Sequence, residues 1–132
     1  KNANSQIKKS GNISVNMTTL DTIIMKNNIS SIDILKIDTE GYESVVLASL
    51  SDLILRNKPF LKLEVYRKLT DAQRQALYRS IAGYGYVVHK IADDGNYFGE
   101  IITDRDMNKW RHFDVFCAPA SAGSAASVRT GK

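Results

Sequence analysis

The chain has 132 residues, 43% of them hydrophobic, a length that suits one globular domain with a buried core but not two. Its net charge of +4 comes from its ends, because residues 13–118 carry 13 basic against 14 acidic side chains, and no interleaved basic and aromatic stripe indicates a nucleic-acid-binding protein. No apolar run is long enough to cross a bilayer and no signal-peptide pattern opens the chain, so we expect a soluble cytoplasmic protein that does not bind membranes.

The first half of the chain predicts alternating helices and strands. Residues 1–12 are polar and lack a period, which is typical of a loop, and Thr18 or Thr19 is placed to cap a short helix over 20–26. The Ile-rich run 31–37 (SIDILKI) predicts a buried strand that ends at Asp38. Apolar residues then recur at spacings of three and four, which predicts one helix over 42–55, broken by the Asn-Lys-Pro sequence at 57–59.

The second half continues this pattern. Residues 60–65 (FLKLEV) predict a strand, and Thr70 with Gln73 forms a capping box for a helix over 71–82 that ends at Gly83. A strand over 84–91, a turn at 93–95, a connection over 96–112 with a short strand near Ile101, and a last strand over 113–118 complete the pattern. The single cysteine, Cys117, allows no internal disulfide and is interpreted as a small core side chain.

This order of elements predicts an α/β fold, with a mostly parallel sheet covered by helices and an antiparallel hairpin at its C-terminal end. Residues 1–118 are interpreted as one domain with the polar lead-in 1–12, and 119–132 as a flexible tail of small and polar residues.

The stretch ILKIDTEGYE, residues 34–43, places several acids and a glycine directly after a predicted strand. Ligands of open α/β sheets bind at the carboxyl ends of the strands, where Asp38 follows one strand and Glu64 ends the next. If the two strands are neighbours, these carboxylates face one pocket, and at a buried strand end Asp38 would be desolvated.

Structural interpretations of the same residues remain open. Glu40 and Glu43 suit the positive N-terminal end of a helix, and Lys36 and Asp38 could form an ion pair along one strand. Gly41 would serve either a positive φ angle or a close approach of the backbone.

Other chemistries have weaker support in the sequence. His89 and His112 lie far apart without zinc-ligand spacing, so no zinc site is predicted, and neither a phosphate-binding loop nor a serine-nucleophile motif is present. A divalent-cation site formed by Asp38, Glu40 and Glu64 is a further, weaker possibility, because hard cations bind carboxylate oxygens.

Three segments together resemble the C-terminal half of the FkbM-type methyltransferases: TTLD (18–21), IDILKIDTEGYESVVL (32–47) and PFLKLEV (59–65). Thr39 and Ser49 stand where the family often has Val and Gly, and the ending FDVFCAP is similar to the closing strand of such domains. The resemblance covers residues 15–119.

The resemblance implies a Rossmann-like fold that binds S-adenosylmethionine and methylates a hydroxyl group of a small molecule or sugar. It places Asp38 as the catalytic base or substrate-orienting group with Glu64 as its partner, and Glu40 and Gly41 as substrate-binding residues. A carboxylate suits this chemistry because an alcohol becomes a good nucleophile only when its proton is removed.

The resemblance also implies that the residues that bind the cofactor lie upstream of Lys1. We therefore expect this chain to lack the N-terminal strands of the domain, and to bind S-adenosylmethionine weakly or not at all on its own. The alternative is a non-catalytic α/β binding or structural module, in which the carboxylates only cap helices.

Overall fold

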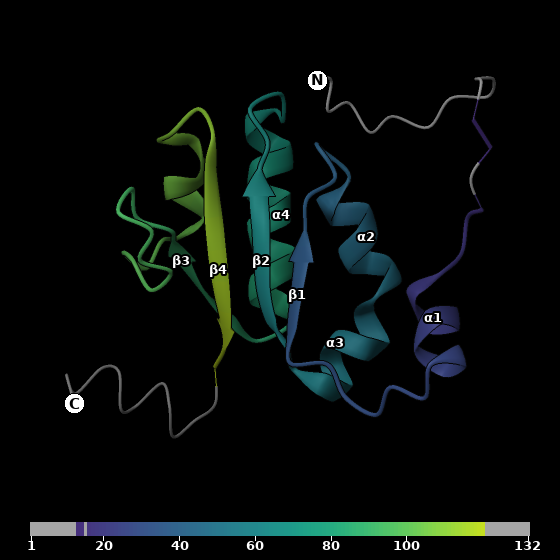
Figure 1. The fold of residues 1–132 in the computed structure, drawn as a ribbon. Helices are drawn as coiled ribbons and strands as arrows, with labels where there is room; N and C mark the ends of the chain where they lie inside the picture. Colours follow the sequence, from purple (N-terminus) through teal and green to yellow (C-terminus); the bar gives the residue numbers. More distant parts are fainter. Residues whose placement is uncertain (1–12, 15, 121–132) are drawn as a thin grey trace.

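The computed structural model describes residues 13–14 and 16–120 of the chain (Figure 1). The predicted lead-in over 1–12 and positions 121–132 of the predicted tail lie outside the described residues.

The strands of the described residues form one sheet in the order β1-β2-β4-β3. These strands are β1 (Ile34–Ile37), β2 (Phe60–Val65), β3 (Tyr86–Lys90) and β4 (Phe113–Pro119). β1 and β2 pair in parallel, whereas β4 pairs antiparallel with both β2 and β3. The predicted C-terminal antiparallel pair is confirmed, but the described sheet is mixed rather than mostly parallel, because β4 inserts between two strands that run in the same direction.

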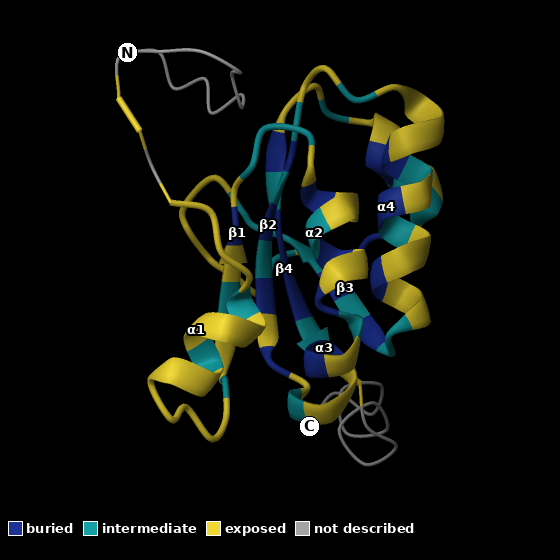
Figure 2. Ribbon diagram, turned by 90° about the vertical axis from the view of Figure 1, so that its right-hand side faces the viewer, coloured by how far each residue is buried: buried dark blue, intermediate teal, exposed yellow. Residues whose placement is uncertain are grey.

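One face of this sheet carries the hydrophobic core. Every second residue of β2 from Leu61 onward is buried, and Phe113, Val115 and Cys117 of β4 are buried beside them. The helices α2 (Glu43–Ser49), α3 (Ser51–Asn57) and α4 (Asp71–Gly83) cover this face (Figures 1 and 2). Among the fully buried side chains are Leu61, Leu63, Val65, Val115 and Cys117 from the sheet and Leu47, Ile54, Leu77 and Ile81 from the helices. Burial of each Leu or Ile contributes about 1.5–3 kcal/mol to stability, and the prediction that Cys117 is a core residue is confirmed.

Two predicted helices are confirmed with their caps. The Thr19 hydroxyl accepts a hydrogen bond from the backbone of Thr22 at the start of α1 (Leu20–Lys26). Thr70 and Gln73 form the predicted capping box of α4 (Asp71–Gly83). α4 is the longest described helix, with 13 residues, and none of the described helices is long and apolar enough to cross a bilayer.

The predicted single helix over 42–55 is wrong. The structure has two shorter helices, α2 (Glu43–Ser49) and α3 (Ser51–Asn57), which meet at Leu50. The Ser49 hydroxyl donates a hydrogen bond to the carbonyl oxygen of Val46, a local contact that competes with the helical hydrogen-bond pattern and bends helices.

The connection between β3 and β4 is part of the core rather than a simple loop. The predicted turn at 93–95 is confirmed by the hydrogen bond from the Gly95 amide to the Ala92 carbonyl, and the predicted strand near Ile101 is reduced to a single bridge with His89. A 3₁₀ helix, η1 (Asp104–Asn108), follows, and its buried Met107 explains why it packs against α4.

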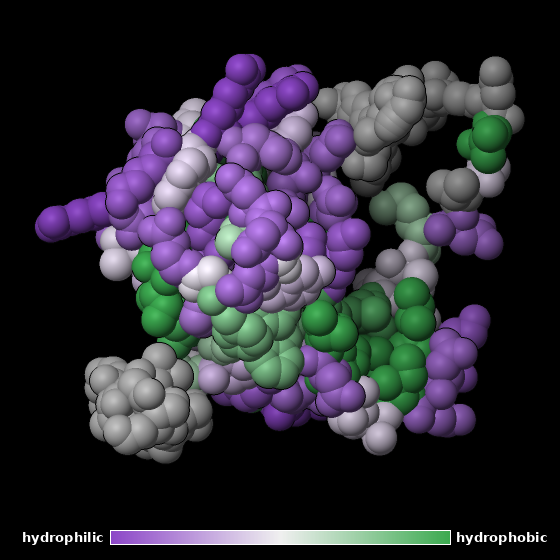
Figure 3. Space-filling model, turned by 60° about the vertical axis from the view of Figure 1, so that its left-hand side comes forward, coloured by the Kyte–Doolittle hydropathy of each residue, from purple (hydrophilic) through white to green (hydrophobic). Residues whose placement is uncertain are grey.

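No described helix covers the opposite face of the sheet (Figure 1). On it, the rings of Phe60 and Phe116 stack with their centroids 5.3 Å apart, and Tyr97 and Phe98 pack against Phe116. Lys62, Glu64 and Asp114 follow toward the carboxyl end of β2. Figure 3 shows hydrophobic surface gathered in the lower part of its view and hydrophilic surface above it.

Candidate active site

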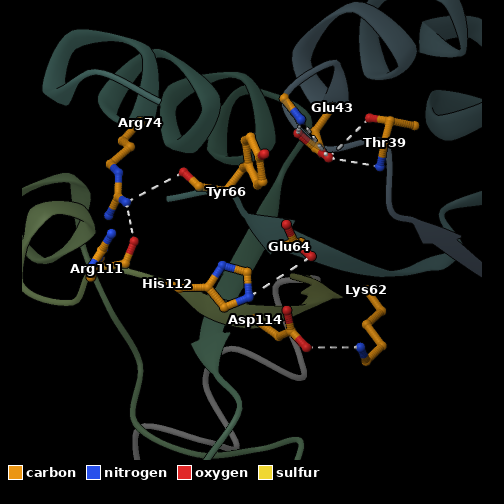
Figure 4. A network of polar contacts seen from close by, with 10 residues as sticks. Thr39, Glu43, Lys62, Glu64, Tyr66, Arg74, Arg111, His112 and Asp114 are labelled. Carbon is orange, nitrogen blue, oxygen red and sulfur yellow. Dashed lines mark hydrogen bonds and ion pairs between the residues drawn. The ribbon is translucent and has the colours of Figure 1, made fainter. Parts of the chain in front are cut away.

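The predicted site residues meet at one edge of the sheet, the edge that the carboxyl ends of β1 and β2 form. Because β1 and β2 are parallel neighbours, Asp38 after β1 and Glu64 near the end of β2 lie at the same edge, as predicted. β4 runs in the opposite direction, so it begins at this edge and brings His112, the residue before its first position, next to Glu64 (Figure 4). The connection 96–112 thus adds a side chain that sequence spacing did not associate with the acids.

The loop between β1 and α2 is shaped by two consecutive residues with positive φ. Glu40 has φ 54° and Gly41 has φ 113°. A Cβ atom added to Gly41 would meet Tyr66 only at 3.6 Å, an ordinary contact, so of the two predicted uses of this glycine the structure supports the backbone conformation rather than close approach.

The buried carboxylate of Glu43 holds this loop. Its Oε1 atom accepts hydrogen bonds from the amide and the hydroxyl of Thr39, and its Oε2 atom accepts one from the Gly41 amide (Figure 4). Only 1% of Glu43 is exposed. The interpretation of Glu43 as an acid that only starts a helix is therefore incomplete, and the Gly41 amide, in a residue predicted to bind substrate, is already engaged by this carboxylate.

Glu64 lies in an open hollow of about 370 Å³. The hollow is lined by Glu40, Glu64, Tyr66, Arg67, Arg111 and His112. It brings together two of the predicted site residues, Glu40 and Glu64, with a histidine and two arginines that the sequence analysis did not assign to the site.

Asp38 lines a second hollow, of about 610 Å³, on the other side of the same loop. Thr18, Thr19, Asp21, Lys36 and Thr39 are among its other lining residues. Asp38 is exposed, which corrects the expectation of a desolvated carboxylate, and it does not share the hollow of Glu64. Within the described part of the chain, Lys36 and Asp38 form no ion pair.

The surroundings of Glu64 shift the pKa of its carboxyl group. Burial raises its pKa above the ordinary value; His112, with Nε2 4.0 Å from Glu64 Oε1, opposes that rise, and repulsion from Asp38 and Asp114 adds to it. Asp38 thus acts on Glu64 although the two carboxylates line different hollows.

Arg74 fixes the segment that carries His112. This α4 residue is 5% exposed, and its guanidinium donates hydrogen bonds to the carbonyl oxygens of Met107 and Trp110. It also donates to the carbonyl oxygens of Tyr66 and Arg111 (Figure 4). Burial lowers the pKa of Arg74. One buried cation therefore joins the end of β2 to the residues that precede β4, a role that the helical spacing of Arg74 could not indicate.

The predicted cation site is not formed as expected. Among the described residues, the acids and histidines that come together as a possible metal-binding group are Glu64, His112 and Asp114, not Asp38, Glu40 and Glu64. Asp38 and Glu40 are therefore not part of this possible metal-binding group.

Comparison with known proteins supports one family. The family model of the Methyltransferase FkbM domain matches residues 1–103, a span that includes β1, the loop to α2, and β2 but ends before β4. Comparison with curated proteins and with solved structures gave no match. Since the matched span covers most of the chain and contains Asp38, Glu40 and Glu64, the chain belongs to the FkbM methyltransferase domain family.

Proposed function

We propose that this chain takes part in methyl transfer from S-adenosylmethionine to a hydroxyl oxygen of a small molecule or sugar. The observation that carries the proposal is the placement of Asp38 and Glu64 at the carboxyl ends of two adjacent parallel strands, in a chain of the FkbM methyltransferase domain family. Ligands of α/β sheets bind at this edge.

The hollow lined by Asp38 fits part of the cofactor. Its volume of about 610 Å³ lies within the range of small-molecule sites. The carboxylate of Asp21 and the hydroxyls of Thr18 and Thr19 would accept hydrogen bonds from ribose hydroxyls. When bound, the cofactor supplies an electrophilic methyl group on a sulfonium.

The residues of the chain would then act on the acceptor. The hollow of Glu40 and Glu64 would hold the acceptor molecule, and the loop between the hollows would bring its hydroxyl group to Asp38. The Asp38 carboxylate would accept the hydroxyl proton as the acceptor oxygen bonds to the methyl carbon and the carbon–sulfur bond breaks, which leaves S-adenosylhomocysteine, and Glu64 would orient the acceptor. A positioned base of this kind contributes on the order of 10²- to 10⁴-fold in rate.

Calorimetry with S-adenosylmethionine tests the proposal, on this chain and on the longest form of the protein that its gene encodes. We expect the longer form to bind the cofactor and release S-adenosylhomocysteine when supplied with hydroxyl-bearing acceptors. Absence of any cofactor affinity in the longer form would refute the proposal and would favour a non-catalytic module.

A further inference from the structure

We propose that Glu64, His112 and Asp114 form a binding site for a divalent transition-metal ion such as Zn²⁺. One ligand atom from each of these residues lies within 4.8 Å of the other two. The proposal is independent of methyl transfer, because it concerns the binding of an ion that can be measured without a cofactor or an acceptor.

The sheet itself brings the three side chains together. Glu64 of β2 and Asp114 of β4 are direct partners in the antiparallel register, so their side chains extend from the same face of the sheet. His112 precedes Asp114 by two residues and reaches Glu64 from the start of β4 (Figure 4). A site on paired strands is positioned by the backbone hydrogen bonds of the sheet rather than by a loop.

The charges around the cluster favour a cation at Glu64. The carboxylates of Glu64 and Asp114 lie directly opposite each other on neighbouring strands and repel. A neighbouring lysine neutralises only one of them. Asp114 has an ion pair with Lys62 at 3.2 Å, but the Glu64 carboxylate accepts no hydrogen bond from the described residues, and only 17% of its side chain is exposed. The Nε2 atom of His112 lies 4.0 Å from Glu64 Oε1.

The donor set selects the class of ion. One imidazole nitrogen and two carboxylate oxygens suit zinc and similar first-row metals, whose bonds to such atoms measure about 2.0–2.2 Å. Bonds of this length at tetrahedral angles place two ligands of one ion about 3.4 Å apart. His112 Nε2 and Glu64 Oε1 lie 4.0 Å apart and would have to approach each other by about half an ångström. The Asp114 carboxylate, which offers an oxygen within 4.8 Å of the other two ligand atoms, would have to move closer to them as well.

The three ligands would leave further positions of the ion open toward the hollow. His112 and Asp114 are half-exposed, so an ion can enter from solvent without unfolding of the sheet. Lys62 forms an ion pair with Asp114, and the positively charged side chains of Arg67 and Arg111 line the hollow and repel a cation. We therefore expect weaker binding of the ion than at a closed four-ligand zinc site.

Zn²⁺ titration against a chromophoric chelator, on the full chain, tests the site. His112→Gln and Asp114→Asn should each weaken Zn²⁺ binding at least about tenfold. The matched control is His89→Gln, because His89 contacts Gly99 and Phe98, away from the cluster, and should leave the affinity unchanged. Circular dichroism melting of each variant establishes that the fold is retained.

Lys62→Gln provides the sharper measurement. It removes the ammonium that competes for Asp114, so the affinity should rise, by up to about fivefold. In NMR spectra, Zn²⁺ should shift the imidazole signals of His112 and leave those of His89 in place. Equal Zn²⁺ affinity in the wild type and the folded His112→Gln variant, or a loss of affinity in Lys62→Gln, would overturn the proposal.

Discussion

The carboxylate of Glu43 is fastened to Thr39 by two hydrogen bonds of 3.0 Å, one from the backbone amide and one from the hydroxyl. A third, from the Gly41 amide, closes the loop between β1 and α2 around this acid. This loop lines both hollows at the edge of the sheet, one through Asp38 and Thr39 and the other through Glu40. Glu43 lines neither hollow, but its hydrogen bonds hold the loop that shapes both.

Glu43→Gln should therefore lower the free energy of unfolding by about 2 kcal/mol, because a charged acceptor of several hydrogen bonds is lost inside the protein. Urea unfolding measures the change. Glu40→Gln makes the same change in the preceding loop, at a carboxylate with no hydrogen bond among the described residues, and should change stability by less than about 0.5 kcal/mol. Equal changes in the two variants would show that the loop does not depend on Glu43.

Arg74 should be equally sensitive to a conservative change. Lys cannot supply four hydrogen bonds in the fixed geometry of a guanidinium, so Arg74→Lys would leave buried carbonyl oxygens unpaired and cost about 2–4 kcal/mol. Thermal or urea unfolding gives the magnitude. Arg79→Lys, on an exposed position of the same helix, is the control and should change stability by less than about 0.5 kcal/mol.

A structural readout separates the role of Arg74 in positioning from its role in stability. Since the guanidinium binds the carbonyl oxygens of Trp110 and Arg111, Arg74→Lys should shift the NMR signals of the neighbouring His112 imidazole, whereas Arg79→Lys should not. Unchanged His112 signals in Arg74→Lys would contradict this role.

Local sequence patterns predicted most of the elements and the C-terminal antiparallel pair, but not the place of β4 between β2 and β3. The alternation in β2 and the Thr70–Gln73 capping box are signals contained within a few residues, and both were confirmed. The pairing of β4 with β2 joins residues about 50 positions apart in the sequence, and such contacts leave no short-range pattern.

The candidate site also has features that the sequence could predict and features that it could not. The adjacency of Asp38 and Glu64 could be predicted because parallel strands align their carboxyl ends. The burial of Glu43 could not, since it follows from the positive φ angles of Glu40 and Gly41, which turn the loop amides toward that carboxylate. The proximity of His112 to Glu64 required the antiparallel register of β4.

Asp106 should make the stability of the fold depend on acid pH. Hydrogen bonds from Lys109 and Thr103 lower the pKa of Asp106 below its ordinary value. A carboxylate with a depressed pKa in the folded state contributes stability that is complete above the unfolded pKa, about 4, and is lost as the pH falls through the folded pKa.

The isosteric change Asp106→Asn isolates this contribution. The wild type should be more stable than Asp106→Asn near neutral pH, and the difference should shrink as the pH falls below about 4. Urea unfolding at a series of pH values measures it, with Asp52→Asn, at an exposed acid without an ion pair in the described part of the chain, as the control. A difference that stays constant with pH would exclude Asp106 as the titrating group.

Asp38→Asn should separate catalysis from folding. Asp38 is exposed and makes no hydrogen bond within the described residues, so its replacement should leave the unfolding midpoint unchanged. If its carboxylate accepts the hydroxyl proton, the same change should lower kcat for methyl transfer at least about tenfold, with a smaller effect on KM. Release of S-adenosylhomocysteine by the longest form of the protein measures both constants.

Two further variants, Glu64→Gln and Asp52→Asn, serve as comparisons for Asp38→Asn. Glu64→Gln should raise KM for the acceptor more than it lowers kcat, because Glu64 is assigned to orientation of the substrate in its hollow. Asp52→Asn removes an acid from α3, outside both hollows, and should leave both constants unchanged. Wild-type kcat in Asp38→Asn would remove Asp38 from the mechanism, and a large fall in kcat for Glu64→Gln alone would assign proton transfer to Glu64 instead.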